Sequence, residues 1–159
     1  MKKILLACLS CLCLVVGCGG ANKGVKDETY DISVKNTGKK YATANDFYDN
    51  YSKLIANSET EFQNCITQLG SDPSKVDVSK LNECKKAMAE KLQELVDTQG
   101  PANKASQEKA LDDLMMKYNN EVVQGLKHKM SVSESDEMLD KISDIQQKMT
   151  VALLDYSIH

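Results

Sequence analysis

The stretch that decides the fold is "DVSKLNECKKAMAEKLQELVDTQGP", residues 77–101. Its apolar residues recur every three or four positions, which places their side chains on one face of an α-helix. Asp77 is a residue type that caps helix N-termini, and Val76 and Leu81 have the spacing of a hydrophobic staple. Gly100 and Pro101 end the pattern. The stretch therefore predicts an amphipathic helix with an apolar stripe of Leu81, Cys84, Met88, Leu92, Leu95 and Val96.

Three further segments carry the same periodicity. One begins at Thr43, which has capping-box spacing to Asp46, and ends before Gly70 and Pro73. Another extends to Met130, and the last opens at Ser133 with Asp136. The stripe positions of these segments are, in order, Phe47, Tyr51, Leu54, Ser58, Phe62, Cys65 and Leu69; Leu111, Leu114, Met115, Tyr118, Val122, Leu126 and Met130; and Met138, Ile142, Ile145, Met149, Ala152 and Tyr156.

Four amphipathic helices joined by short connections bury their stripes most economically by packing together. We therefore predict an all-α fold, an up-down-up-down four-helix bundle over residues 43–159. A solenoid of helix pairs is the structural alternative, but the sequence shows no fixed-period repeat. Methionines on the stripes are interpreted as core, with an adaptable groove for a partner helix as the alternative: Met88, Met115, Met138 and Met149.

The N-terminus has the pattern of a secretory signal. Lys2 and Lys3 precede an apolar run over residues 4–16, which is too short for a transmembrane helix. Val15-Val16-Gly17-Cys18 then resembles the lipobox of bacterial lipoproteins. The resemblance implies that residues 1–17 are a signal peptide, and that Cys18 is lipidated and anchors the protein permanently to a membrane.

Two consequences follow from this resemblance. Cys8, Cys11 and Cys13 would be discarded with the signal peptide, so the Cys8–Cys11 C-x-x-C is not interpreted as a metal or redox site. In enteric-type sorting an Asp after the lipidated cysteine favours the inner membrane, so Gly19 favours the outer membrane. Residues 19–42 offer little to bury, and we predict that residues 18–42 form the lipidated cysteine and a flexible tether.

Cys65 and Cys84 are the cysteines that remain after Cys18. They lie near the end of the first predicted helix and the start of the second, at similar heights in an antiparallel hairpin. In an oxidising envelope compartment this arrangement predicts a disulfide. Two free buried thiols are the alternative, and a catalytic thiol is a weaker one because no His or Asn partner is evident.

Charge and motifs exclude several function classes. The chain has 20 basic and 23 acidic residues and no Arg, and loss of Lys2 and Lys3 would change its net charge from −3 to −5. Nucleic acid is therefore not expected as a partner. His128 and His159 lack the Glu-x-x-His spacing of di-iron bundles, and Asp136, Asp140 and Asp144 are interpreted as a solvated helix edge. We expect no metal, no cofactor and no catalytic residues.

The C-terminal sequence "VALLDYSI", residues 151–158, is apolar on more than one helix face. We expect its surplus face to be covered by the tether, by a second copy in a homo-oligomer or by a protein partner. The candidate partner-binding residues are Val151, Leu153, Leu154, Tyr156 and Ile158. The sequence thus favours a non-catalytic, lipid-anchored cell-envelope lipoprotein that binds a protein or has a structural role. A pilotin-like chaperone of a secretion-system component and an inhibitor or immunity lipoprotein are the alternatives.

Overall fold

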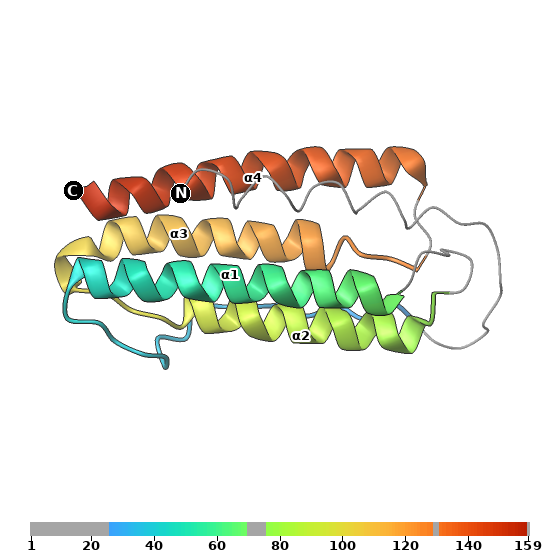
Figure 1. Cartoon of the computed structure of the whole chain (residues 1–159), viewed down its shortest axis with the longest axis horizontal. Coiled ribbons are helices and arrows are strands. Elements are labelled where there is room, and N and C mark those ends of the chain that lie inside the picture. The colour runs from blue at the N-terminus through green and yellow to red at the C-terminus, as the bar shows by residue number, and fades with distance from the viewer. Residues whose placement is uncertain (1–25, 70–75, 129–130, 159) are drawn as a thin grey trace.

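The computed structural model describes residues 26–69, 76–128 and 131–158, and within these ranges the fold is all-α, as predicted. The fold has four long helices, and Figure 1 shows them lying side by side. They are α1 (Ala44–Leu69), α2 (Val78–Val96), α3 (Ala105–Tyr118) and α4 (Val132–Ile158). A 3₁₀ turn, η3 (Ala102–Lys104), leads into α3, and a π-helical turn, η4 (Asn119–Val123), follows it.

Two helix starts were predicted correctly and one was not. Thr43 Oγ1 accepts the Asp46 amide at 3.1 Å before α1, and Asp77 accepts the Ser79 amide at 2.9 Å before α2. Before α4 the capping box is Ser131 with Glu134, two residues earlier than the predicted Ser133 and Asp136. Both pairs have the same Ser-x-x-acid spacing, so the sequence pattern alone did not distinguish them.

The third helix is shorter than predicted. The expected helix extends to Met130, whereas α3 ends at Tyr118 and the π-helical turn closes with the Gln124 amide donating to Asn119 at 3.1 Å. Leu126 follows this turn outside any helix and is still buried. Its place in the apolar pattern therefore reflected burial and not helical conformation.

The core is formed by the predicted stripes, which meet between the helices. Nearly every stripe position described above is buried or packs against buried residues. An aromatic cluster lies at the end of the domain where α1 begins: the Phe47 ring centroid is 5.1 Å from that of Tyr51 and 4.5 Å from that of Tyr156. Gly100 lies against this cluster, and a Cβ atom there would be 2.1 Å from the Tyr156 hydroxyl.

The structure corrects the prediction of a flexible tether for its described part, residues 26–42, which we call the strap. The strap is extended and follows α2 along its length, from Asn82 near the helix start to Asp97 and Gln99 beyond its end (Figure 1). Ile32 is the one strap residue that is buried, and it joins the core. The helical domain therefore includes residues 26–42 in addition to the predicted 43–159.

Side-chain amides of α2 hold the strap backbone, since among the residues that the structure describes no strand lies beside it. Asn82 accepts the Glu28 amide at 2.9 Å and donates to the Lys26 carbonyl at 2.9 Å. Gln93 binds the amide and carbonyl of Ser33 in the same way, at 3.1 and 2.6 Å. These carboxamides present a donor and an acceptor together, as a neighbouring strand would. The strap consequently needs no strand to satisfy these groups.

Candidate functional site

A groove of about 690 Å³ lies between α1 and α4, and we call it the α1–α4 groove. Its lining includes buried side chains from α2, α3 and α4, namely Leu92, Met115, Tyr118 and Met149. Ile55 of α1 and Val151, Leu153 and Leu154 of α4 add further apolar surface. Ser52, Ser58, Gln146 and Gln147 contribute polar groups. A mostly apolar concavity with few polar groups is typical of binding sites.

The helical period of α4 explains why apolar side chains remain outside the core. Met149 and Tyr156, seven residues apart, face inward and are buried. Val151, Leu154 and Ile158 follow one another at spacings of three and four on an adjacent face, and are 66%, 49% and 72% exposed. The last two turns of α4 therefore carry one apolar face for the core and a second that the described residues leave uncovered.

The predicted binding face is thus brought together only in part. Val151, Leu153 and Leu154 line the groove, and Ile158 is exposed but is not among the lining residues. Tyr156 was assigned to this face wrongly, whereas its assignment to the core stripe is confirmed: it is fully buried against Phe47. The sequence showed the surplus of apolar residues, but the helix phase that separates inward from outward positions depends on how α4 packs.

Polar contacts also fix Tyr156 in the interior. Its hydroxyl donates to Glu108 Oε1 at 3.1 Å, and its carbonyl accepts from the buried Lys104 Nζ at 2.7 Å. Burial, followed by the nearby Glu108 charge, raises the pKa of the Tyr156 hydroxyl above its ordinary value. The side chain therefore acts as a neutral, hydrogen-bonded part of the core.

The electrostatics of the α1–α4 groove suit an apolar ligand. Glu59 is the one acidic or basic side chain in the lining, and burial raises its pKa. A carboxyl group that loses hydration in this way would favour a neutral or cationic neighbour over an anionic one. Within the described residues, no group of three His, Cys, Asp or Glu side chains is arranged to hold a metal ion. The groove offers mostly apolar area.

The Asp112 carboxyl group of α3 has a pKa far above its ordinary value. Burial, then repulsion from Glu108 and Asp113, raises its pKa to about 7. The folded chain thus keeps a proton that the unfolded chain loses at about pH 4, so stability falls as the pH rises from about 4 to 7. We expect Asp112→Asn to remove this slope and to raise the free energy of unfolding at pH 8 by about 1–2 kcal/mol, after allowance for solvent screening of a partly exposed group.

Denaturant unfolding at pH 5 and pH 8 checks this expectation. Asp140→Asn, at an exposed acid of α4, is the matched control and should leave the wild-type slope in place. Equal slopes for Asp112→Asn and the wild type would contradict the assignment.

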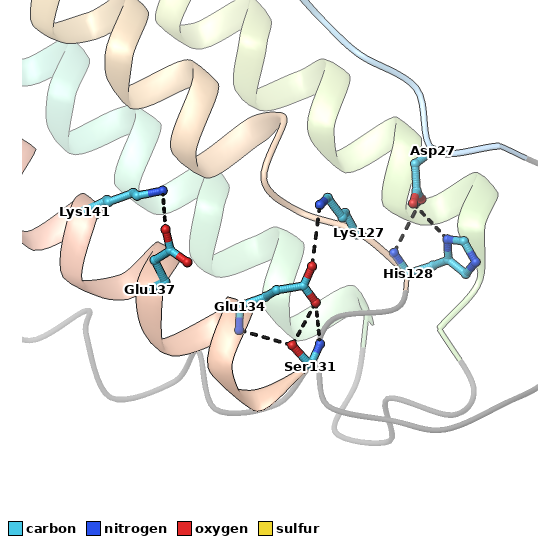
Figure 2. Close-up of polar contacts among 7 residues, drawn as sticks. All are labelled: Asp27, Lys127, His128, Ser131, Glu134, Glu137 and Lys141. Carbon is cyan, nitrogen blue, oxygen red and sulfur yellow. Dashed lines mark hydrogen bonds and ion pairs between the residues drawn. The ribbon is translucent and has the colours of Figure 1, made fainter.

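In addition to the apolar groove, a polar cluster lies where the strap begins. Asp27 is bonded to His128 through Oδ2 to Nδ1 at 2.9 Å, and its Oδ1 accepts the His128 amide at 3.4 Å (Figure 2). His128 was expected late in a helix, whereas it lies in the connection before α4. Beside this pair Lys85 is almost fully buried, and its pKa is lowered by burial against the opposing attraction of Asp27 and Glu28. Asp27 and His128 are 101 residues apart in the chain, so no local sequence pattern could have revealed their contact.

The same connection is tied to α4. Lys127 Nζ is 4.0 Å from Glu134, which accepts from the Ser131 amide and hydroxyl, as Figure 2 shows. These hydrogen bonds lower the pKa of Glu134. The start of α4 is therefore fixed beside the strap by polar contacts at the surface. The other acids of this region are solvated, as interpreted: Asp136, Asp140 and Asp144 are exposed, and Asp144 pairs with Lys148.

The predicted cysteine pair is brought together. The Cys65 and Cys84 sulfur atoms are 2.09 Å apart, at disulfide distance, and link α1 to α2. The predicted lipidation site Cys18, the three cysteines before it and His159 lie outside the described residues. None of the described helices has the length and apolarity needed to cross a membrane.

Comparison with protein-family models, with curated proteins and with solved structures finds no match to this chain. The fold and the site themselves define the class of protein, an all-helical, disulfide-linked domain with an apolar groove.

Proposed function

We propose that this protein is a lipid-anchored lipoprotein of the bacterial cell envelope, most consistent with the outer membrane. Its helical domain, an up-down-up-down bundle, binds another protein without catalysing a reaction. The lipobox-like Val15-Val16-Gly17-Cys18 supports the anchor and the compartment. The Cys65–Cys84 pair fits an oxidising compartment.

The α1–α4 groove is the observation that carries the binding role. Val151 and Leu154 expose apolar side chains along a concavity of about 690 Å³ that already has a buried apolar floor. Contiguous exposed apolar surface beside a pocket marks interaction sites in soluble domains. Amphipathic helices insert apolar side chains into grooves of this kind, so a partner helix is the ligand that this surface favours.

A pilotin-like chaperone is a second candidate. Lipoproteins of that class combine a small helical fold, a disulfide and a groove, and this domain has the same three features. The comparison rests on the fold alone, so it names a type of partner, a secretin subunit, and assigns no residue. No feature of the structure favours the inhibitor or immunity alternative.

Site-specific cross-linking in intact envelopes tests the binding role. A photo-reactive amino acid at Leu154 should trap one partner in a stoichiometric adduct, because this side chain lies in the groove and is half exposed. A second substitution, Val151→Lys, should reduce that adduct at least tenfold, since a charge placed on apolar contact surface costs more than about 1.4 kcal/mol.

The matched control places the same reactive group at Asp140, an exposed position of α4 outside the groove lining. The two positions should give different products. If Leu154 and Asp140 trap the same scattered neighbours, and Val151→Lys changes neither pattern, the groove is not a protein-binding site.

A further inference from the structure

The strap determines which end of the domain the membrane anchor reaches. This inference rests on the proposed lipidation of Cys18. If the tether extended to Thr43, the anchor would connect at the start of α1. In the structure the chain is already bound to the domain at Lys26, where its carbonyl accepts from Asn82. The point of attachment is therefore near the start of α2 and not near the start of α1.

These two points are at opposite ends of the domain. The strap follows α2, whose 19 residues span about 28 Å. At the far end of α2, the Gly38 amide donates to the Asp97 carbonyl, and Tyr41 and Lys39 bond with Gln99. The start of α1 follows directly, beside Gly100 and the aromatic cluster of Phe47 and Tyr156. Seating the strap thus moves the attachment point from one end of the helices to the other.

The length of chain between the anchor and the domain changes as well. From Cys18 to Lys26 the backbone can reach at most about 28 Å, because an extended residue spans about 3.5 Å. From Cys18 to Thr43 the limit would be about 88 Å by the same reckoning. A seated strap therefore holds the start of α2 close to the bilayer, and a released strap would allow the whole domain to turn and to move away.

Several independent contacts hold the strap in this position. Asp27 bonds to His128, the Asn82 and Gln93 amides bind the backbone, and Ile32 is buried in the core. Asn119 also donates to the Tyr30 carbonyl at 3.0 Å. The acidic Asp27 and Glu28 lie near Lys85, so charge complementarity acts at the end closest to the anchor.

We propose that the seated strap orients the domain on the membrane, with the end of the domain that carries Asn82 of α2 and Ser131, the residue before α4, facing the lipid surface. The end that carries Gly100 and Tyr156 faces away from the membrane. The last turns of α4, with Val151 and Leu154 in the groove, lie toward this distal end, where a partner in the periplasm or outside the cell can reach them.

Energy transfer to the membrane tests the orientation. The full-length lipidated protein is placed in phospholipid vesicles that contain an acceptor-labelled lipid. A donor dye is attached through a bio-orthogonal amino acid at Lys80, in the first turn of α2, or at Asn103 in η3, both exposed. We expect transfer from position 80 to exceed that from position 103 by about twofold or more, because the two sites are separated by about the length of α2. Equal transfer, or stronger transfer from position 103, would overturn the proposal.

A variant of the strap provides the second part of this energy-transfer test. Ile32→Asp puts a charge at the buried strap position and should abolish the difference between the two labels. Val34→Asp is the matched control. It introduces the same charge at a strap position that is 38% exposed, and it should preserve the difference. An unchanged difference in Ile32→Asp would show that strap seating does not set the orientation.

Vesicle flotation separates failure of the orientation from failure of the anchor. The wild type should float with the vesicles and Cys18→Ser should not. If both behave alike, the lipid anchor is wrong and the orientation falls with it. If flotation requires Cys18 but the two labels transfer equally, the anchor stands and the orientation alone is refuted.

Discussion

Replacing Tyr156 with Ala should lower the free energy of unfolding by about 3–5 kcal/mol, the range for removal of a large buried aromatic side chain. Tyr156 is fully buried, packs its ring against that of Phe47 and donates a hydrogen bond to Glu108. Truncation would leave a cavity at the end of the core and an unpaired Glu108. Denaturant unfolding followed by circular dichroism measures the loss.

Ile158→Ala is the matched control, two residues away on the same helix. Ile158 is 72% exposed, so its truncation should change stability by less than about 0.5 kcal/mol. If Tyr156→Ala does not fold, Tyr156→Phe isolates the hydrogen bond and should cost about 1 kcal/mol. Similar small effects for Tyr156→Ala and Ile158→Ala would mean that Tyr156 belongs to a surface and not to the core.

Removal of the Cys65–Cys84 link should have the second largest effect. The two residues are 19 apart in sequence, and closing a loop of this size stabilises a fold by about 3 kcal/mol in the chain-entropy model. Cys65→Ser combined with Cys84→Ser should therefore lower the free energy of unfolding by about that amount. Reduction of the wild type should produce the same loss, and the reductant should have no further effect on the double variant.

A thiol assay on the unfolded, unreduced protein gives a direct check of the bond. The mature chain should show no free thiol from Cys65 or Cys84. Two reactive thiols in that assay, together with wild-type stability that a reductant does not change, would show that the pair remains reduced.

Local sequence patterns predicted the helical content well. The spacing of Leu81, Cys84, Met88 and Leu92 gave α2, and the side chains at Thr43 and Asp77 gave two helix starts, because these signals depend on neighbours within one or two turns. The Cys65–Cys84 pairing was also predictable, since two successive helices bring nearby residues to similar heights. The end of α3 was missed because burial of Leu126 outside a helix produces the same apolar spacing.

The site was predicted less completely. An apolar surplus near the C-terminus identified Val151, Leu153 and Leu154, but the contribution of Ile55 and Leu92 to the same groove depends on how α1 and α2 pack against α4. Tyr156 was placed both on the core stripe of the last segment and on the binding face, and its contact with Phe47, 109 residues away in the chain, decides for the core. Periodicity shows which residues share a helix face, and it does not show which partner that face meets.

By itself, the sequence determined that this protein is helical, where two of its helices begin, and most of the apolar residues that fill its core. The tertiary structure alone decided that residues 26–42 lie along α2. The reason is that carboxamides of Asn82 and Gln93 bind the strap backbone across 54 to 60 residues of chain. Such contacts use the peptide groups that every residue has, so they leave no periodic pattern in the amino-acid sequence.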